Sequence, residues 1–196
     1  MRWVTRAALL GILGVHVAPA QAGTVEGTVS VNGLPAVRAV IVLEGPAAAA
    51  PAAPRPQVVM DQRNLAFVPG VLPVLRGTII EFTNSDDVQH NVFSPSAAAR
   101  KFNLGTYGPG AAGAVKLDTT GEVVVLCNIH MEMEARILVL DTPYFSTVGR
   151  DGHFRIADVP PGTYAVRVWQ ERWLPTVQTL QVPETEGLTV NVVTEK

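Results

Sequence analysis

The sequence predicts an all-β protein. Almost no segment places apolar residues at the spacing of a helix face, whereas several short segments alternate apolar with polar residues or consist largely of β-branched residues. Turn-forming runs such as "RDGH" and "VPPGTY" separate these segments, and the chain contains 17 Gly and 15 Pro. Many short strands joined by tight turns are typical of β-sandwiches.

The expected strands fall on both sides of a low-complexity segment. Residues 46–56 are almost entirely Pro and Ala, which predicts an extended linker. Seven other segments have the pattern of strands, and they are Thr24–Val31, Ala36–Gly45, Thr78–Asn84, Val123–Ile129, Ala135–Leu140, Thr163–Trp169 and Leu188–Val193.

The N-terminus has the features of a secretory signal peptide. Arg2 and Arg6 form a short basic region, Ala7–Val17 is apolar apart from His16 and glycines, and a small-x-small motif ends at Ala22. We expect residues 1–22 to be removed after Ala22, which would place the mature protein in the periplasm or outside the cell. No later segment is long and apolar enough to predict a membrane span.

The charge of the chain gives no reason to expect nucleic acid as a partner. The formal net charge is −2 at pH 7, and removal of Arg2 and Arg6 would make the mature chain more acidic. The mature sequence also contains no basic cluster. Electrostatic binding to phosphates therefore has no visible basis.

The single cysteine, Cys127, is the most informative residue. Exported domains usually use cysteines in pairs, and one cysteine cannot form an internal disulfide. It could be an inert buried thiol, half of an intermolecular bridge, or a metal ligand. His130 and Met133 follow it in a C-x-x-H-x-x-M pattern, and His90 lies upstream after an expected strand and a polar turn. These neighbours favour the metal ligand.

A thiolate, two imidazoles and a thioether are the ligand set of a trigonal copper site with a weak axial methionine. Zinc prefers four strong ligands, although Glu132 and Glu134 keep a zinc site open as an alternative. Met133 lies just before the strand expected from Ala135, so the loop can turn back over the site. Met131 is adjacent to His130, and its side chain is expected to leave the backbone in another direction.

The segments "LPVLRGTIIEFTNSDDVQHNVFS" and "VVVLCNIHMEM" resemble the cupredoxins, the small blue copper proteins, over residues 57–140. The short ligand loop is most similar to that of amicyanin and related plastocyanin-like and azurin-like proteins. The resemblance implies a Greek-key β-sandwich that holds one type 1 copper ion through His90, Cys127, His130 and Met133. It further implies a surface position for His130 and bracing of the ligand loops by Asn91 and Asn128. A single-electron carrier also needs a docking rim around the exposed histidine, and the uncharged Pro69, Gly70, Val71 and Pro109 could supply it.

A wider resemblance covers most of the mature chain, and a further one lies outside the copper region. The runs "DQRNLAFVPGVLPV", "CNIH" and "DTPYFSTVGRDGHFRIADVPPGTYAVRVW" are similar to exported proteins commonly called methylamine utilization proteins. The runs "TVEGTVSVNGLPAVRAVIVLEG" and "DGHFRIADVPPGTYAVRVW" resemble two parts of a carboxypeptidase-regulatory-like, transthyretin-like sandwich. We therefore expect a discontinuous second sandwich from residues 23–45 and 141–196, interrupted by the linker 46–56 and the cupredoxin domain 57–140. His153, Trp169 and Trp173 are expected to be surface or core residues of it, and a ligand or docking face formed by these aromatic residues is the alternative.

The expected function is transfer of single electrons between redox proteins, such as a cytochrome and a dehydrogenase. The alternative is a copper-binding module for storage, delivery or sensing. A carbohydrate- or peptide-binding module would rest on the second sandwich alone. An enzyme is least favoured, because the sequence has no second copper ligand set, no nucleophile elbow and no Gly-rich phosphate loop.

Overall fold

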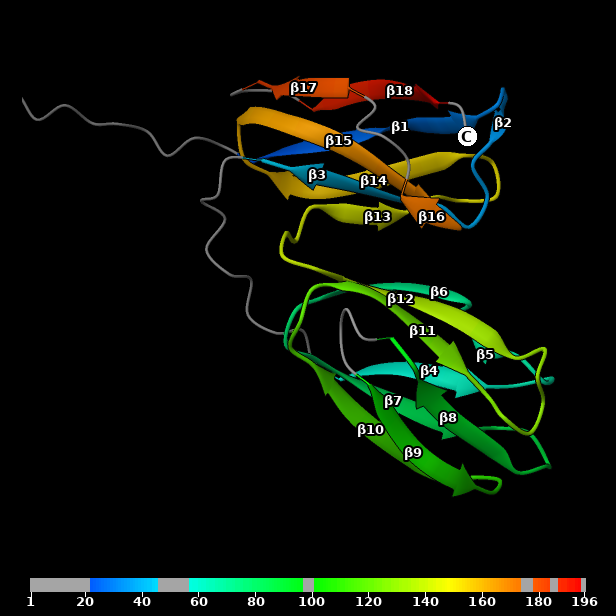
Figure 1. Cartoon of the computed structure of the whole chain (residues 1–196). Helices are drawn as coiled ribbons and strands as arrows, with labels where there is room; N and C mark the ends of the chain where they lie inside the picture. The colour runs from blue at the N-terminus through cyan, green and yellow to red at the C-terminus, as the bar shows by residue number, and fades with distance from the viewer. Residues whose placement is uncertain (1–21, 46–56, 97–100, 174–177, 184–186, 195–196) are drawn as a thin grey trace, which may run out of the picture.

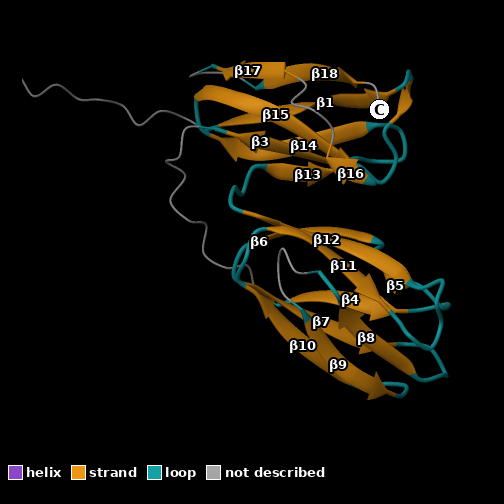
Figure 2. Cartoon of the chain, viewed as in Figure 1, coloured by secondary structure: helices purple, strands orange, loops and turns teal. Residues whose placement is uncertain are grey.

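The structure is a computed structural model that describes residues 22–45, 57–96, 101–173, 178–183 and 187–194. Within these residues the regular secondary structure is entirely β, as Figure 2 shows, which confirms the predicted all-β class. The expected signal peptide, apart from Ala22, and the Pro/Ala linker lie outside the described residues. In the described part of the chain, no helix has the length and apolarity that crossing a membrane would require.

The middle of the chain forms a two-sheet unit that we call the inserted sandwich (Figure 1). One sheet has the strand order β10-β7-β4-β5 and the other β6-β12-β11-β8-β9. The strands are β4 (Val58–Gln62), β5 (Phe67–Val68), β6 (Val71–Leu75), β7 (Thr78–Asn84), β8 (His90–Ser94), β9 (Phe102–Tyr107), β10 (Ala112–Leu117), β11 (Gly121–Leu126) and β12 (Glu134–Leu140).

The two ends of the chain form a second two-sheet unit, the split sandwich. One sheet has the order β14-β1-β18 with β2 paired to β1, and the other has the order β13-β3-β15-β16 with β17 paired to β15. The strands are β1 (Gly23–Val31), β2 (Leu34–Pro35), β3 (Val40–Glu44), β13 (Phe145–Thr147), β14 (His153–Val159), β15 (Gly162–Gln170), β16 (Arg172–Trp173), β17 (Gln178–Val182) and β18 (Leu188–Thr194).

Pairing in the split sandwich joins segments that are far apart in the sequence. Strand β1 pairs antiparallel with β14 and parallel with β18, while β3 lies between β13 and β15. The segments 23–44 and 145–194 thus share two sheets and one hydrophobic core, which includes Val25, Ile41, Phe154 and Val166. The chain leaves this unit after β3 and returns to it at β13.

The strand expected over Ala36–Gly45 begins later than predicted. Arg38 has a left-handed φ of 59°, and the Ala39 amide donates to the Ala36 carbonyl at 3.3 Å. Because this turn breaks the extended conformation, β3 starts only at Val40.

The two sandwiches pack against each other through strands that are buried on both faces. Val40 and Val42 of β3 and Leu138 and Leu140 of β12 form a third buried cluster with Trp169, while their sequence neighbours point into the two sandwich cores. This double burial explains why "VIVL" and "ILVL" are continuous apolar runs and do not alternate.

A polar contact crosses the same seam. Trp169, which is only 2% exposed, donates its indole N–H to Oε2 of Glu122 at 3.0 Å. The other Glu122 oxygen pairs with Nε of Arg136 at 2.9 Å. Trp169 was expected to be a surface or core residue of its own sandwich, and the structure shows it buried where the two sandwiches meet.

Candidate metal centre

The four predicted ligands lie at strand ends of one sheet or, for His130, within the loop that joins two of its strands. His90 is the first residue of β8, Cys127 follows the last residue of β11, and Met133 precedes the first residue of β12. The loop between them is closed by two backbone hydrogen bonds, from the Cys127 amide to the Met133 carbonyl at 3.3 Å and from the Met133 amide to the His130 carbonyl at 3.0 Å. The loop thus returns Met133 to the level of Cys127.

Three of these residues form a compact donor cluster. One donor atom each of His90, Cys127 and His130 lies within 4.8 Å of the others. The two imidazole Nδ1 atoms are 3.1 Å apart. Nitrogens that bind one ion through bonds of about 2 Å cannot be more than about 4 Å apart, so this separation fits a shared ion. His90 and Cys127 are buried, whereas His130 is partly exposed.

The two methionines of the loop occupy opposite environments. Met133 is 1% exposed and packs in the same core cluster as Cys127, whereas Met131 is 87% exposed. Among the described residues, neither Glu132 nor Glu134 belongs to the donor cluster, and the Glu134 carboxylate pairs with Arg136. A thiolate, two imidazoles and a nearby buried thioether fit copper better than zinc.

Asn91 connects the cysteine to the neighbouring strand. Its backbone amide donates to Sγ of Cys127 at 3.4 Å, and its side-chain amide donates to Oδ1 of Asn103 and the carbonyl of Gly105, both at 3.0 Å. Asn91 therefore links the sulfur of Cys127 to residues of β9. Asn128 is exposed, and its side chain makes no hydrogen bond within the described part of the chain.

Asp86 is a component of the site that the sequence analysis missed. Its Oδ2 lies 2.9 Å from Nε2 of His90, and its carboxylate also accepts the backbone N–H groups of Asn64 and Leu65. Burial alone would raise the pKa of Asp86, but the hydrogen bonds that it accepts, led by that from Leu65, lower it below the ordinary value of 3.8. The sequence feature that could have revealed Asp86 is its position, four residues before the candidate ligand His90.

A tyrosine lies beside the centre. Tyr107 pairs with His90 between β9 and β8. Its hydroxyl donates to the carbonyl of Phe82 at 3.1 Å and accepts from Nε2 of the buried Gln62 at 2.9 Å. Burial, reinforced by the nearby Cys127, raises the pKa of Tyr107 to about 12, so the phenol stays neutral. Nothing in the local sequence had indicated this residue.

An exposed apolar rim lies on the loops at this end of the inserted sandwich. Of the predicted rim residues, Pro69 and Pro109 are exposed and Gly70 and Val71 are half-buried. The loops that hold Asp86, His130 and the β4–β5 hairpin also expose larger apolar side chains, which are Leu65, Val68, Val88, Ile129 and Met131.

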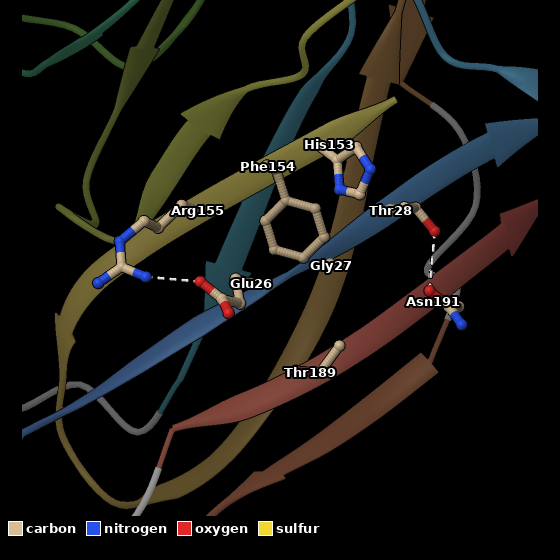
Figure 3. A pocket seen from close by; sticks show the side chains of 8 residues that line it. All are labelled: Glu26, Gly27, Thr28, His153, Phe154, Arg155, Thr189 and Asn191. Carbon is tan, nitrogen blue, oxygen red and sulfur yellow. Dashed lines mark hydrogen bonds and ion pairs between the residues drawn. The ribbon is translucent and has the colours of Figure 1, made fainter. Parts of the chain in front are cut away.

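A hollow of about 540 Å³ lies on the outer face of the sheet β14-β1-β18 (Figure 3). Most of the polar side chains there pair across strands: Arg155 with Glu26, and the Thr28 hydroxyl with Oδ1 of Asn191 at 2.8 Å. Such cross-strand pairs are typical of a solvated sheet face. His153, expected at the surface or in the core, is exposed here. Among the described residues, no metal-ligand cluster includes it.

No family model matches the chain, and no curated protein does. Several solved structures do. A copper-containing nitrite reductase from Thermus scotoductus SA-01 is 25% identical over 50% of this chain and 26% of its own length, with a TM-score of 0.43. A purple cupredoxin from Nitrosopumilus maritimus is 20% identical over 44% of this chain and 100% of its own, with a TM-score of 0.37. A reduced copper(I) form of an amicyanin variant is 18% identical over 53% of this chain and 99% of its own, with a TM-score of 0.41.

Proposed function

We propose that this protein is an exported type 1 copper protein that carries single electrons between redox partners. The observation that supports it most is the convergence of His90, at the start of β8, with Cys127 and His130, from the loop between β11 and β12, with donor atoms within 4.8 Å. We assign these three residues as ligands and the buried Met133 as the weak axial ligand. The copper ion, when bound, would supply a one-electron couple between its +1 and +2 states.

The surroundings of the cluster suit electron transfer. A buried histidine and cysteine at strand ends keep their positions, so donors change little between oxidation states. The partly exposed His130 offers the electron a route to the surface. The apolar rim around it is the kind of surface on which a transient redox partner, such as a cytochrome or dehydrogenase, can dock.

The proposal includes a cellular location and a domain organisation. The signal peptide expected at residues 1–22 would direct the chain to the periplasm or the outside. We assign residues 57–140 to a cupredoxin domain inserted into a carboxypeptidase-regulatory-like sandwich of residues 23–45 and 141–196. The pairing of β1 and β3 with strands after residue 140 supports this organisation. We propose no catalytic role.

The test is the spectrum of the copper-loaded mature protein. An intense visible thiolate-to-Cu(II) band with narrow EPR hyperfine splitting is expected. Cys127→Ser should abolish this band without preventing folding. A protein that binds only Cu(I) and stays colourless would contradict electron transfer and favour copper storage or delivery.

A further inference from the structure

We propose that the tip of the β4–β5 hairpin tunes the metal centre by holding Asp86 against His90. Asp86, Asn64 and Leu65 would then be positioning residues, which act on the metal through His90. This inference rests on the copper function proposed above, and it adds a control element outside the ligand loop. It is carried by three hydrogen bonds and an unusual backbone turn.

The three hydrogen bonds converge on one carboxylate. Oδ1 of Asp86 accepts the backbone N–H of Asn64, while Oδ2 accepts the N–H of Leu65 at 3.0 Å and faces Nε2 of His90 at 2.9 Å. An ionised carboxylate can only accept, so His90 must donate from Nε2. In the neutral imidazole Nδ1 of His90 then keeps its lone pair, and it is this atom that faces Nδ1 of His130 at 3.1 Å. Asp86 thus fixes the tautomer that a metal needs.

The hairpin tip adopts a backbone conformation that its residues disfavour. Arg63 and Ala66 exchange backbone hydrogen bonds of 2.9 and 3.2 Å and close a two-residue turn. The central residues Asn64 and Leu65 have φ of 55° and 56°, both left-handed. Asn tolerates this region, but Leu at the second position is costly, where glycine is the usual residue.

The turn geometry explains what the strained backbone provides. The two central N–H groups of such a turn are not used within it, and consecutive N–H groups of this kind form an anion-binding concavity. Here both point at Asp86. The hairpin therefore anchors the carboxylate from one side while His90 donates to it from the other.

A charged acceptor behind an imidazole makes that imidazole a stronger donor to a metal. The effect is larger for Cu(II) than for Cu(I), because the oxidised ion carries the higher charge. Asp86 should therefore strengthen copper binding and lower the reduction potential. Leu65 is also 52% exposed on the apolar rim, so two hydrogen bonds connect a residue of this rim to the buried His90.

The first experiment needs no metal. Nitrogen-15 NMR of the metal-free protein should show His90 as the Nε2–H tautomer, and Asp86→Asn should reduce the population of that tautomer. A native His90 that carries its proton on Nδ1 would overturn the proposal. This result is independent of the thiolate-to-copper band, so failure of the proposed function and failure of the Asp86 link can be distinguished.

The second experiment compares neighbouring charges in the copper-loaded protein. Asp86→Asn should weaken copper binding by about 10- to 100-fold. If Cu(II) affinity falls tenfold more than Cu(I) affinity, the potential rises by about 59 mV. The control is Asp87→Asn, which removes the same charge from an exposed side chain that is not among the hydrogen-bond or ion-pair partners of His90 in the described part of the chain. Equal shifts of the reduction potential in both variants would show that the effect comes from the loss of negative charge alone. That result would refute a positioning role for Asp86.

Two hairpin variants test the role of the hairpin itself. Changing Asn64 and Leu65 together to glycine keeps both N–H groups and suits the left-handed conformation. The potential and the His90 tautomer should then remain as in the native protein. Asn64→Pro removes one N–H and demands a negative φ, so it should move both readouts in the direction of Asp86→Asn. A folded Asn64→Pro variant with native potential and tautomer would contradict the role of the hairpin.

Discussion

Replacement of Met133 and Met131 by the same residues should separate an axial ligand from a surface methionine. We expect Met133→Leu to raise the reduction potential of the copper-loaded protein, because it removes a donor that stabilises Cu(II). Met133→Gln should lower it, because an amide oxygen is a better donor to Cu(II) than a thioether. Both variants should keep the thiolate band with a shifted spectrum. The same substitutions at Met131 should change neither property.

The burial of the two residues sets the magnitudes. Met133 is 1% exposed, and a Met-to-Leu change in a core conserves volume, so the metal-free protein should lose less than about 1.5 kcal/mol of unfolding free energy. Met133→Gln places an amide in the core and should cost about 1–3 kcal/mol. Met131 is 87% exposed, and its variants should stay within about 0.5 kcal/mol. A tenfold change in relative Cu(II) and Cu(I) affinity equals about 59 mV, and the two Met133 variants should differ by at least that.

Protein-film voltammetry measures the potentials, and urea unfolding of the metal-free proteins measures the stabilities. The stability series shows whether each variant is folded before its potential is interpreted. A flat potential across the Met133 series, or a large shift in the Met131 series, would refute the axial assignment. The three other ligands would be unaffected by that outcome.

Two further predictions concern the scaffold. Burial alone would raise the pKa of Asp61, but the hydrogen bonds from Thr83 and Ser85 more than offset this effect. The pKa of Asp61 is therefore lowered below its ordinary value of 3.8. A carboxyl group with a lowered pKa stabilises the fold at pH values above its unfolded-state pKa, and this contribution is lost as the pH falls through its folded-state pKa. In Asp61→Asn, the unfolding free energy measured in urea should therefore fall less steeply between about pH 5 and pH 2 than in the native protein. Trp169→Phe removes the hydrogen bond to the Glu122 carboxylate and should cost about 1.5–3 kcal/mol in urea unfolding. An Asp61→Asn protein that loses stability in acid as steeply as the native protein would contradict the first prediction. A Trp169→Phe protein that loses less than about 0.5 kcal/mol of unfolding free energy would contradict the second.

Local sequence patterns were sufficient for the ligand candidates and for many of the strands. The C-x-x-H-x-x-M spacing and the apolar runs around it are visible within a few residues, and the structure brings His90, Cys127 and His130 together. The expected strand Thr78–Asn84 coincides with β7. These features are short-range, so the sequence can reveal them without knowledge of the fold.

The remainder depends on contacts between distant segments. In the sequence, Asp86 is one of several polar residues in a turn. Its carboxylate has a fixed position only because the hairpin at Asn64 and Leu65, about twenty residues away, donates hydrogen bonds to it. The sequence around Trp169 predicts only an ordinary residue of its own sandwich, although its hydrogen-bond partner Glu122 belongs to the other sandwich. The run Ile137–Leu140 is continuously apolar because both of its faces are buried, but nothing near it in the sequence identifies the strand that covers the second face.

The split arrangement of β1 and β3 has a kinetic consequence. Glu26 and Arg155, which pair across the outer sheet, are 129 residues apart along the chain. The cost of closing so long a loop must be met before the sheet gains any contact, which slows folding. The inserted sandwich is continuous and can form first, and its entry into β4 and exit from β12 lie on the same side of it (Figure 1). Once folded, it holds the two ends of residues 57–140 near each other and so shortens the loop that the surrounding strands must close. A metal ion that stabilised this unit would therefore accelerate closure of those strands.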